Sequence, residues 1–259
     1  MEKIPGKVYN GKERCGEQMF RLIIMGIRSF FFMLYEINKC NYMVKHPEKY
    51  SELDRYREVQ KIVDKLRKNS RTTTDVFGIG NLPEKGPYIM FANHQGHYDG
   101  LGIVINHKKP LTIIIDSKRE HQIVVKQMLP MVGGRAINLK DPRQQLKTLS
   151  AVSDDLKKGK IYLIFPEGQY GDNKNTLQEF KAGVFKCAFD VKVPVVPVAL
   201  VDSYKAMDGN SLKKVRTQVH FLKPIQYDEY KDLKKTELAE LVKSKIQEVL
   251  DNYKVSENN

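Results

Sequence analysis

The stretch YIMFANHQGHYDG, residues 88–100, passes from an apolar run to a polar turn that contains two glycines. A short apolar run bounded by turn residues is typical of a buried strand. In sheets of α/β proteins, reactive groups collect just beyond the carboxyl ends of the strands. The stretch therefore predicts an internal strand that ends at a functional site containing His94, His97 and Asp99.

The same alternation continues on both sides of this stretch, where short apolar runs are separated by segments of helical periodicity. Strands are predicted at residues 75–79, 88–92, 111–115, 135–139, 161–165, 195–200 and 216–222, and helices at 98–107, 120–129, 142–158, 177–190 and 235–253. Strands that alternate with helices indicate an α/β fold. We expect a mixed, largely parallel sheet flanked by helices.

An unusual apolar segment, MFRLIIMGIRSFFFMLY, occupies residues 19–35. Arg21 and Arg28 interrupt it, so it lacks the run of about 18 uncharged residues that a membrane-spanning helix needs. On a helix the two arginines share a narrow stripe, with Ser29 beside it, and apolar side chains cover the rest. This pattern favours a helix that lies in a membrane interface. The alternative is a core helix whose arginines reach out to solvent.

A second amphipathic helix is predicted over residues 51–70, where Ser51 and Asp54 form a capping-box-like start. We therefore divide the chain into an N-terminal helical membrane-docking segment, residues 1–70, and an α/β domain, residues 71–259.

Composition narrows the choice of partners. The net charge of +13 indicates an anionic partner, which could be nucleic acid, a membrane surface or an anionic substrate. The chain has no tryptophan and no zinc-finger or helix-turn-helix pattern, so nucleic acid is not expected. Three widely spaced cysteines, Cys15, Cys40 and Cys187, favour a reducing compartment. We expect peripheral or monotopic association with anionic lipids on the cytoplasmic face of the cell membrane.

His94 and Asp99 have the residue types of an oriented base. If a helix begins near His97, the Asp99 carboxylate can accept the Nδ1–H of His94 and leave Nε2 free to take a proton. Such a base can deprotonate a hydroxyl for attack on an activated acyl group. A metal site made of His94, His97 and Asp99 is the alternative. It lacks the H-E-x-x-H pattern and a clear distant ligand, so no metal is expected.

A second polar turn follows another predicted strand in IYLIFPEGQYGDN, residues 161–173. The chain resembles the glycerolipid acyltransferase family, the 1-acylglycerol-3-phosphate acyltransferases, in four elements that occur in the family's order. They are Asn93-His94 with Asp99, Phe165-Pro166-Glu167-Gly168, Phe180-Lys181 with Gly183, and Val193-Pro194 with Pro197. The resemblance covers about residues 88–200.

The resemblance implies transfer of a fatty acyl group from a thioester, on coenzyme A or acyl carrier protein, to the free hydroxyl of lysophosphatidate. The product would be phosphatidic acid, and no further cofactor is implied. His94 would be the general base and Asp99 its orienting partner. Glu167 would position the glycerol backbone of the acceptor, and Gly168, which has no side chain, would allow close approach to the main chain. The family's membrane-docking helices also resemble the N-terminal segment.

Two departures from the family concern recognition of the phosphate. Family members commonly continue the Glu-Gly motif with Thr and Arg, whereas this chain has Gln169 and Tyr170. A second block usually ends in an acidic residue and an arginine, but residues 133–145 read GGRAINLKDPRQQ. Nearby cations are expected to replace the missing arginines. The candidates are Lys140, Arg143 and Lys181, with Arg135 as a further possibility.

Two alternative functions remain open at this level. The acceptor could be another lysolipid or an amino-lipid, with the same chemistry. The chain could also be a non-catalytic lipid-surface binding protein, although the complete set of His94, Asp99 and Glu167 argues against a degenerate site.

Overall fold

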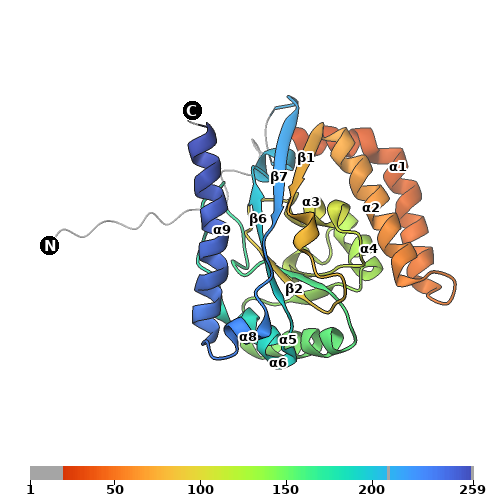
Figure 1. The fold of residues 1–259 in the computed structure, drawn as a ribbon. Helices are drawn as coiled ribbons and strands as arrows, with labels where there is room; N and C mark the ends of the chain where they lie inside the picture. The colour runs from red at the N-terminus through yellow and green to blue at the C-terminus, as the bar shows by residue number, and fades with distance from the viewer. Residues whose placement is uncertain (1–19, 209–210, 258–259) are drawn as a thin grey trace.

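One seven-stranded sheet organises the computed structural model, which describes residues 20–208 and 211–257 (Figure 1). Met19, the first residue of the predicted N-terminal helix, and Cys15 lie outside the described residues. The strands are β1 (Thr72–Phe77), β2 (Ile89–Ala92), β3 (Thr112–Asp116), β4 (Arg135–Ile137), β5 (Tyr162–Ile164), β6 (Val195–Val201) and β7 (Val215–Phe221).

The sheet is mixed and largely parallel, as the sequence predicts. Its order is β1-β7-β6-β2-β5-β3-β4. The five strands from β6 to β4 are parallel, whereas β7 is antiparallel to β6 and parallel to β1. β2 lies between β5 and β6, with Phe91 paired to Ile164 on one side and Pro197 on the other. The segments that follow β2, β5 and β6 therefore emerge side by side at one edge of the sheet.

Helices cover both faces of the sheet because its central strand is apolar on both. Met90 and Ala92 pack into one core and Ile89 and Phe91 into the other, and all four are fully buried. The first core is completed by α1 (Phe20–Lys45), α2 (Glu52–Asn69), α3 (Asp99–Asn106) and α4 (Ile123–Met131). The second is completed by α5 (Pro142–Lys157), α6 (Lys186–Val191) and α9 (Lys235–Glu257). Figure 1 shows α9 and the α1–α2 pair on opposite sides of the sheet.

Helix α1 buries Arg21 and Ser29 against the protein, whereas Arg28 of the predicted stripe is exposed. Arg21 is only 1% exposed, and its guanidinium donates to main-chain carbonyls in the segment before β7, including Ser211 at 2.7 Å and Lys213. Ser29 is also buried and accepts a hydrogen bond of 2.7 Å from the Asn69 side chain at the end of α2. These bonds satisfy the buried polar groups and fix the rotation of α1 about its axis.

The opposite side of α1 is apolar and faces outward. Phe31 is 83% exposed and Ile27 is 68% exposed. We call this surface the outer face of α1, and it consists of Phe20, Ile23, Ile27, Phe30, Phe31, Leu34 and Tyr35. Exposed apolar patches of this kind mark interaction or membrane sites on soluble proteins. Within the described part of the chain, no helix has both the length and the apolar character required to cross a bilayer.

The structure differs from the sequence prediction in two elements that flank the site. Helix α1 continues to Lys45, ten residues beyond the predicted end. Residues 177–181 are not helical, and only a 3-10 turn (Ala182–Phe185) and α6 form in the second half of the predicted 177–190 helix. The side chain of Gln178 binds Glu167 and the Gln169 carbonyl, and these bonds hold the segment in an extended path.

Candidate active site

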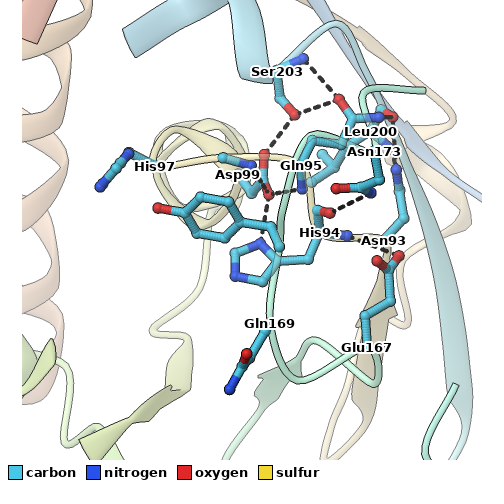
Figure 2. A network of polar contacts seen from close by, with 12 residues as sticks. Asn93, His94, Gln95, His97, Asp99, Glu167, Gln169, Asn173, Leu200 and Ser203 are labelled. Atoms are coloured by element: carbon cyan, nitrogen blue, oxygen red, sulfur yellow. Dashed lines mark hydrogen bonds and ion pairs between the residues drawn. The ribbon is translucent and has the colours of Figure 1, made fainter. Parts of the chain in front are cut away.

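The imidazole of His94 is fixed by Asp99, the first residue of α3. His94 Nδ1 lies 2.6 Å from Asp99 Oδ2, and the aspartate is fully buried (Figure 2). The same oxygen accepts the main-chain N–H groups of Gln95 and Gly96, while the Ser203 hydroxyl donates to Oδ1. Four donors thus surround a carboxylate that would otherwise be costly to bury. This arrangement sets Nδ1 as the protonated nitrogen and leaves Nε2 free to act as a base.

Two aromatic rings hold the His94 ring from either side. Phe165, just after β5, stacks on it with ring centroids 4.3 Å apart. Tyr170 meets it edge to face at 4.5 Å. These contacts, together with the bond to Asp99, leave the imidazole little freedom to rotate.

Glu167 lies behind the main chain of His94. Its Oε1 accepts the His94 N–H at 3.1 Å and its Oε2 accepts the Gln178 amide at 2.7 Å. Burial raises the pKa of the Glu167 carboxyl to about 7, although both hydrogen bonds favour the charged form. Glu167 is not among the residues that line the cavity, because both of its oxygens face internal donors. Both carboxylate oxygens are thus engaged by internal donors, and the role of Glu167 in positioning the acceptor stays a prediction.

Polar side chains tie the end of β2 to β6, and of these the sequence analysis includes Asn93 in a motif but not Gln95 or Asn173. The Asn93 amide exchanges two hydrogen bonds with the main chain of Leu200, at 3.0 and 2.7 Å. Gln95 also donates to the Leu200 carbonyl, and its own oxygen accepts the main-chain N–H of Ser203 (Figure 2). Asn173 donates to the His94 carbonyl at 3.0 Å. For Gln95 and Asn173, the only signal in the sequence is their position in the polar turns that follow strands.

A cavity of about 870 Å³ opens beside His94. Much of its lining is apolar, formed by residues that include Ile113, Ile115, Leu139, Leu146 and Val184. The described residues that line it include no serine, threonine or cysteine. Within that described lining, His94 has no serine, threonine or cysteine beside it, and a group on a substrate can be its partner.

The cations predicted for phosphate recognition separate into two groups. Lys181 lines the cavity, and its amino group packs over Gly168, whose φ is +75°. A Cβ at Gly168 would lie 2.7 Å from Lys181 Nζ, so only glycine permits this approach. Lys140 and Arg143 are exposed and are not among the residues that line the cavity.

Helical periodicity explains why Arg143 does not line the cavity. The stripe of α5 that lines the cavity consists of Pro142, Gln145, Leu146 and Leu149, and Arg143 is off that stripe. Lys140 belongs to the turn before the helix, and Arg135 pairs with Asp155 at 2.7 Å. The cations that line the cavity are Lys118, Arg119, Lys181, Lys186 and Lys235, of which the sequence singled out Lys181 alone.

His97 lines the same cavity and contacts the Tyr170 ring, but it is held differently from His94. Its Nδ1 pairs with Asp208, and its ring points away from the His94 ring (Figure 2). Among residues 20–208 and 211–257, no three His, Cys, Asp or Glu side chains are grouped in a way that could hold a metal ion.

Comparison with known families matches the part of the chain that contains this site. A family model described as Acyltransferase matches residues 73–201, a range that contains His94, Asp99, Glu167 and Lys181. The chain belongs to this acyltransferase family, as the resemblance in its motifs indicates.

Individual relatives extend the similarity beyond the matched range. The chain is 26% identical over 223 residues to the 1-acyl-sn-glycerol-3-phosphate acyltransferases of Salmonella typhimurium and Escherichia coli, which covers 85% of this chain and 88% of each relative. Among solved structures, the 1-acyl-sn-glycerophosphate (LPA) acyltransferase PlsC from Thermotoga maritima matches with a TM-score of 0.73. That match covers 90% of this chain and 96% of the other at 18% identity, and it shows a shared fold.

The raised pKa of Glu167 predicts a pH-dependent stability. A carboxyl that titrates near 4.5 in the unfolded chain and about 7 in the folded protein makes the folded state bind the proton more tightly. The free energy of unfolding therefore falls as the pH rises between these values. We expect Glu167→Gln to remove this fall, so that the variant gains up to about 3 kcal/mol relative to wild type between pH 4 and pH 8. Urea unfolding at several pH values measures the difference, and parallel curves for the two proteins would contradict the raised pKa.

Proposed function

We propose that this protein transfers a fatty acyl group from a thioester to the free hydroxyl of lysophosphatidate, giving phosphatidic acid. One observation carries the proposal: His94, oriented by a buried Asp99, faces a largely apolar cavity whose described lining offers no serine, threonine or cysteine nucleophile. A base in this setting can act on a substrate hydroxyl. The printed names of the relatives, 1-acyl-sn-glycerol-3-phosphate acyltransferases, support lysophosphatidate as the acceptor.

The reaction needs a single proton relay through His94. Nε2 takes the proton of the acceptor hydroxyl as its oxygen attacks the thioester carbonyl carbon. The carbon–sulfur bond then breaks, and the leaving sulfur takes the proton back from the imidazolium. The products are an ester and a free thiol. Asp99 stabilises the imidazolium that forms during the reaction and keeps the correct tautomer.

The remaining site residues position these groups. Glu167 holds the main chain at His94 through the His94 N–H and acts as a positioning residue. Lys181, above Gly168, offers a positive charge to the acceptor phosphate. The apolar end of the cavity can receive the acyl chain, and a volume of about 870 Å³ is within the usual range for small-molecule sites. The donor would be acyl-CoA or acyl carrier protein, with no other cofactor.

The outer face of α1 would bring the site to its lipid substrates. Its aromatic and aliphatic side chains are exposed, whereas Arg21 and Ser29 are used for internal contacts. A helix oriented in this way can bury its apolar face in the acyl boundary of a bilayer. The net charge of +13 adds attraction to anionic lipids. We place the protein on the cytoplasmic face of the cell membrane, as a peripheral or monotopic protein.

A non-catalytic lipid-surface binding protein could use the same outer face. That function gives no reason to bury Asp99 beneath the His94 imidazole or to pack Phe165 and Tyr170 around the ring. Another lysolipid or an amino-lipid as acceptor would leave the mechanism unchanged.

The role of His94 can be tested with three variants. We expect His94→Ala to lower kcat about 10²–10⁴-fold, the usual contribution of a general base. Asp99→Asn should be nearly as damaging, because it disturbs the tautomer and orientation of the imidazole. His97→Ala should cost much less, since its ring points away from His94. Transfer of labelled acyl groups to lysophosphatidate measures all three, with circular dichroism to confirm folding. A loss in His97→Ala equal to that in His94→Ala, or activity that follows added zinc, would overturn the assignment.

Membrane docking can be tested at the outer face of α1. We expect Ile27→Ser, Phe30→Ser and Phe31→Ser together to release the protein from anionic vesicles, because they remove three of the exposed apolar side chains of that face. Co-sedimentation with phosphatidylglycerol vesicles measures binding, which should also weaken as salt is added.

A matched control removes three exposed apolar side chains from other surfaces, through Phe77→Ser, Ile79→Ser and Val255→Ser. This control should sediment like wild type. Equal release of both triple variants would show that general surface hydrophobicity, and not α1, holds the protein on vesicles.

A further inference from the structure

A stacked arginine and tyrosine stand next to the base. Arg119 ends the 3-10 turn Ser117–Arg119, directly after β3. Its guanidinium carbon lies 4.5 Å from the centroid of the Tyr170 ring, and its Nη1 donates to the Tyr170 hydroxyl at 2.7 Å. The same Tyr170 ring meets His94 edge to face at 4.5 Å. One aromatic ring therefore connects a guanidinium to the general base.

The Arg119 guanidinium is fixed in place but retains open donors. It lines the cavity and is partly buried. An arginine carries five N–H donors, and the Tyr170 hydroxyl is the one acceptor that Arg119 contacts within the described residues. No carboxylate of the described residues forms an ion pair with it. A partly buried cation with open donors and no counter-ion provides a favourable place for an anion.

A second cation, Lys181, contacts the chain close to Tyr170. Lys181 packs over Gly168, and Arg119 stacks on Tyr170, two residues farther along the chain. The Cα atoms of Gly168 and Tyr170 are at most about 7 Å apart, so the two cations contact one short stretch of the chain. Lys181 likewise has no carboxylate partner among the described residues.

We propose that Arg119, held by Tyr170, binds the phosphate monoester of the lysolipid acceptor and thereby selects dianionic acceptors. This inference rests on the function proposed above. A planar guanidinium binds a phosphate with two parallel hydrogen bonds, whereas a lysine acts as a point charge. Tyr170 is a positioning residue, because it orients the guanidinium and leaves its remaining donors open. Arg119 thus supplies a cation that the Gln169-Tyr170 sequence of the motif lacks.

The number of covalent bonds between the reacting atom and the nearest phosphorus favours the acceptor over the donor as the source of this phosphate. In lysophosphatidate the reacting hydroxyl oxygen is four covalent bonds from phosphorus. In acyl-CoA or acyl carrier protein, the nearest phosphorus is more than ten covalent bonds from the thioester sulfur. The hydroxyl must reach Nε2 of His94, and Arg119 is separated from that imidazole by a single ring. A phosphate close to the base is therefore the acceptor's.

Steady-state kinetics with soluble short-chain acceptors tests this role. We expect Arg119→Gln to raise the KM for lysophosphatidate about ten- to a hundredfold, which corresponds to a lost charge-assisted hydrogen bond. The KM for the acyl donor and the activity on lysophosphatidylcholine should change less than about twofold. Arg119→Lys should restore part of the loss, and Tyr170→Phe should raise the same KM by a smaller factor. The control Arg57→Gln removes an identical charge from an exposed position outside the cavity and should match wild type.

Equilibrium binding separates this inference from the function on which it rests. Calorimetry with short-chain lysophosphatidate on His94→Ala, with and without Arg119→Gln, needs no turnover, and we expect the second change to weaken binding at least tenfold. If wild type acylated no lysolipid, the proposed function would fail while this binding difference could still stand. Unchanged binding, equal losses on both acceptors, or an increase confined to the KM of the donor would each overturn the role of Arg119.

Discussion

The hydrogen bond between His94 and Asp99 is the contact on which the rest of the site depends. It forms because β2 ends two residues before His94 and α3 begins at Asp99, so the chain turns back beneath the imidazole. The buried carboxylate is tolerated because main-chain and hydroxyl donors surround it, and one of these donors, Ser203, comes from beyond β6. The order of the parallel strands therefore serves the chemistry by bringing the ends of β2, β5 and β6 together.

A second constraint is the rotation of α1. The internal hydrogen bonds of Arg21 and Ser29 fix which side of the helix faces the protein, where Met25, Cys40 and Met43 also pack into the core. A second apolar side, the outer face of α1, is left exposed, whereas an ordinary surface helix exposes a polar face. An enzyme whose acceptor and product are membrane lipids gains from such a helix, because binding at the interface brings the cavity to the lipid. The apolar face and the His94 site are thus two parts of one proposed function.

Much of the fold and the centre of the site could be predicted from the sequence, because periodicity and motif order report local structure. The apolar run before His94 predicts β2, and the spacing from His94 to Asp99 predicts their contact. Arg119 could not be found in this way. Its position depends on contact with Tyr170, which is 51 residues away along the chain. For a related reason, the sequence could not show that Arg143 lies off the stripe of α5 that lines the cavity. It shows that a cation is near a strand end but not which stripe of the helix faces the cavity. Residues 177–181 do not form the predicted helix, because the Gln178 side chain bonds to Glu167, a tertiary contact that overrides local propensity.

The central claim is that His94 activates a substrate hydroxyl directly, without an acyl-enzyme intermediate. Rapid mixing of wild-type protein with acyl-CoA labelled in the acyl group tests it most directly, with thiol release and protein-bound label followed in the presence and absence of lysophosphatidate. The account predicts that thiol appears only when the acceptor is present, in a one-to-one ratio with labelled phosphatidic acid, and that no label remains on the denatured protein. A burst of thiol without acceptor, accompanied by label on the protein, would contradict it.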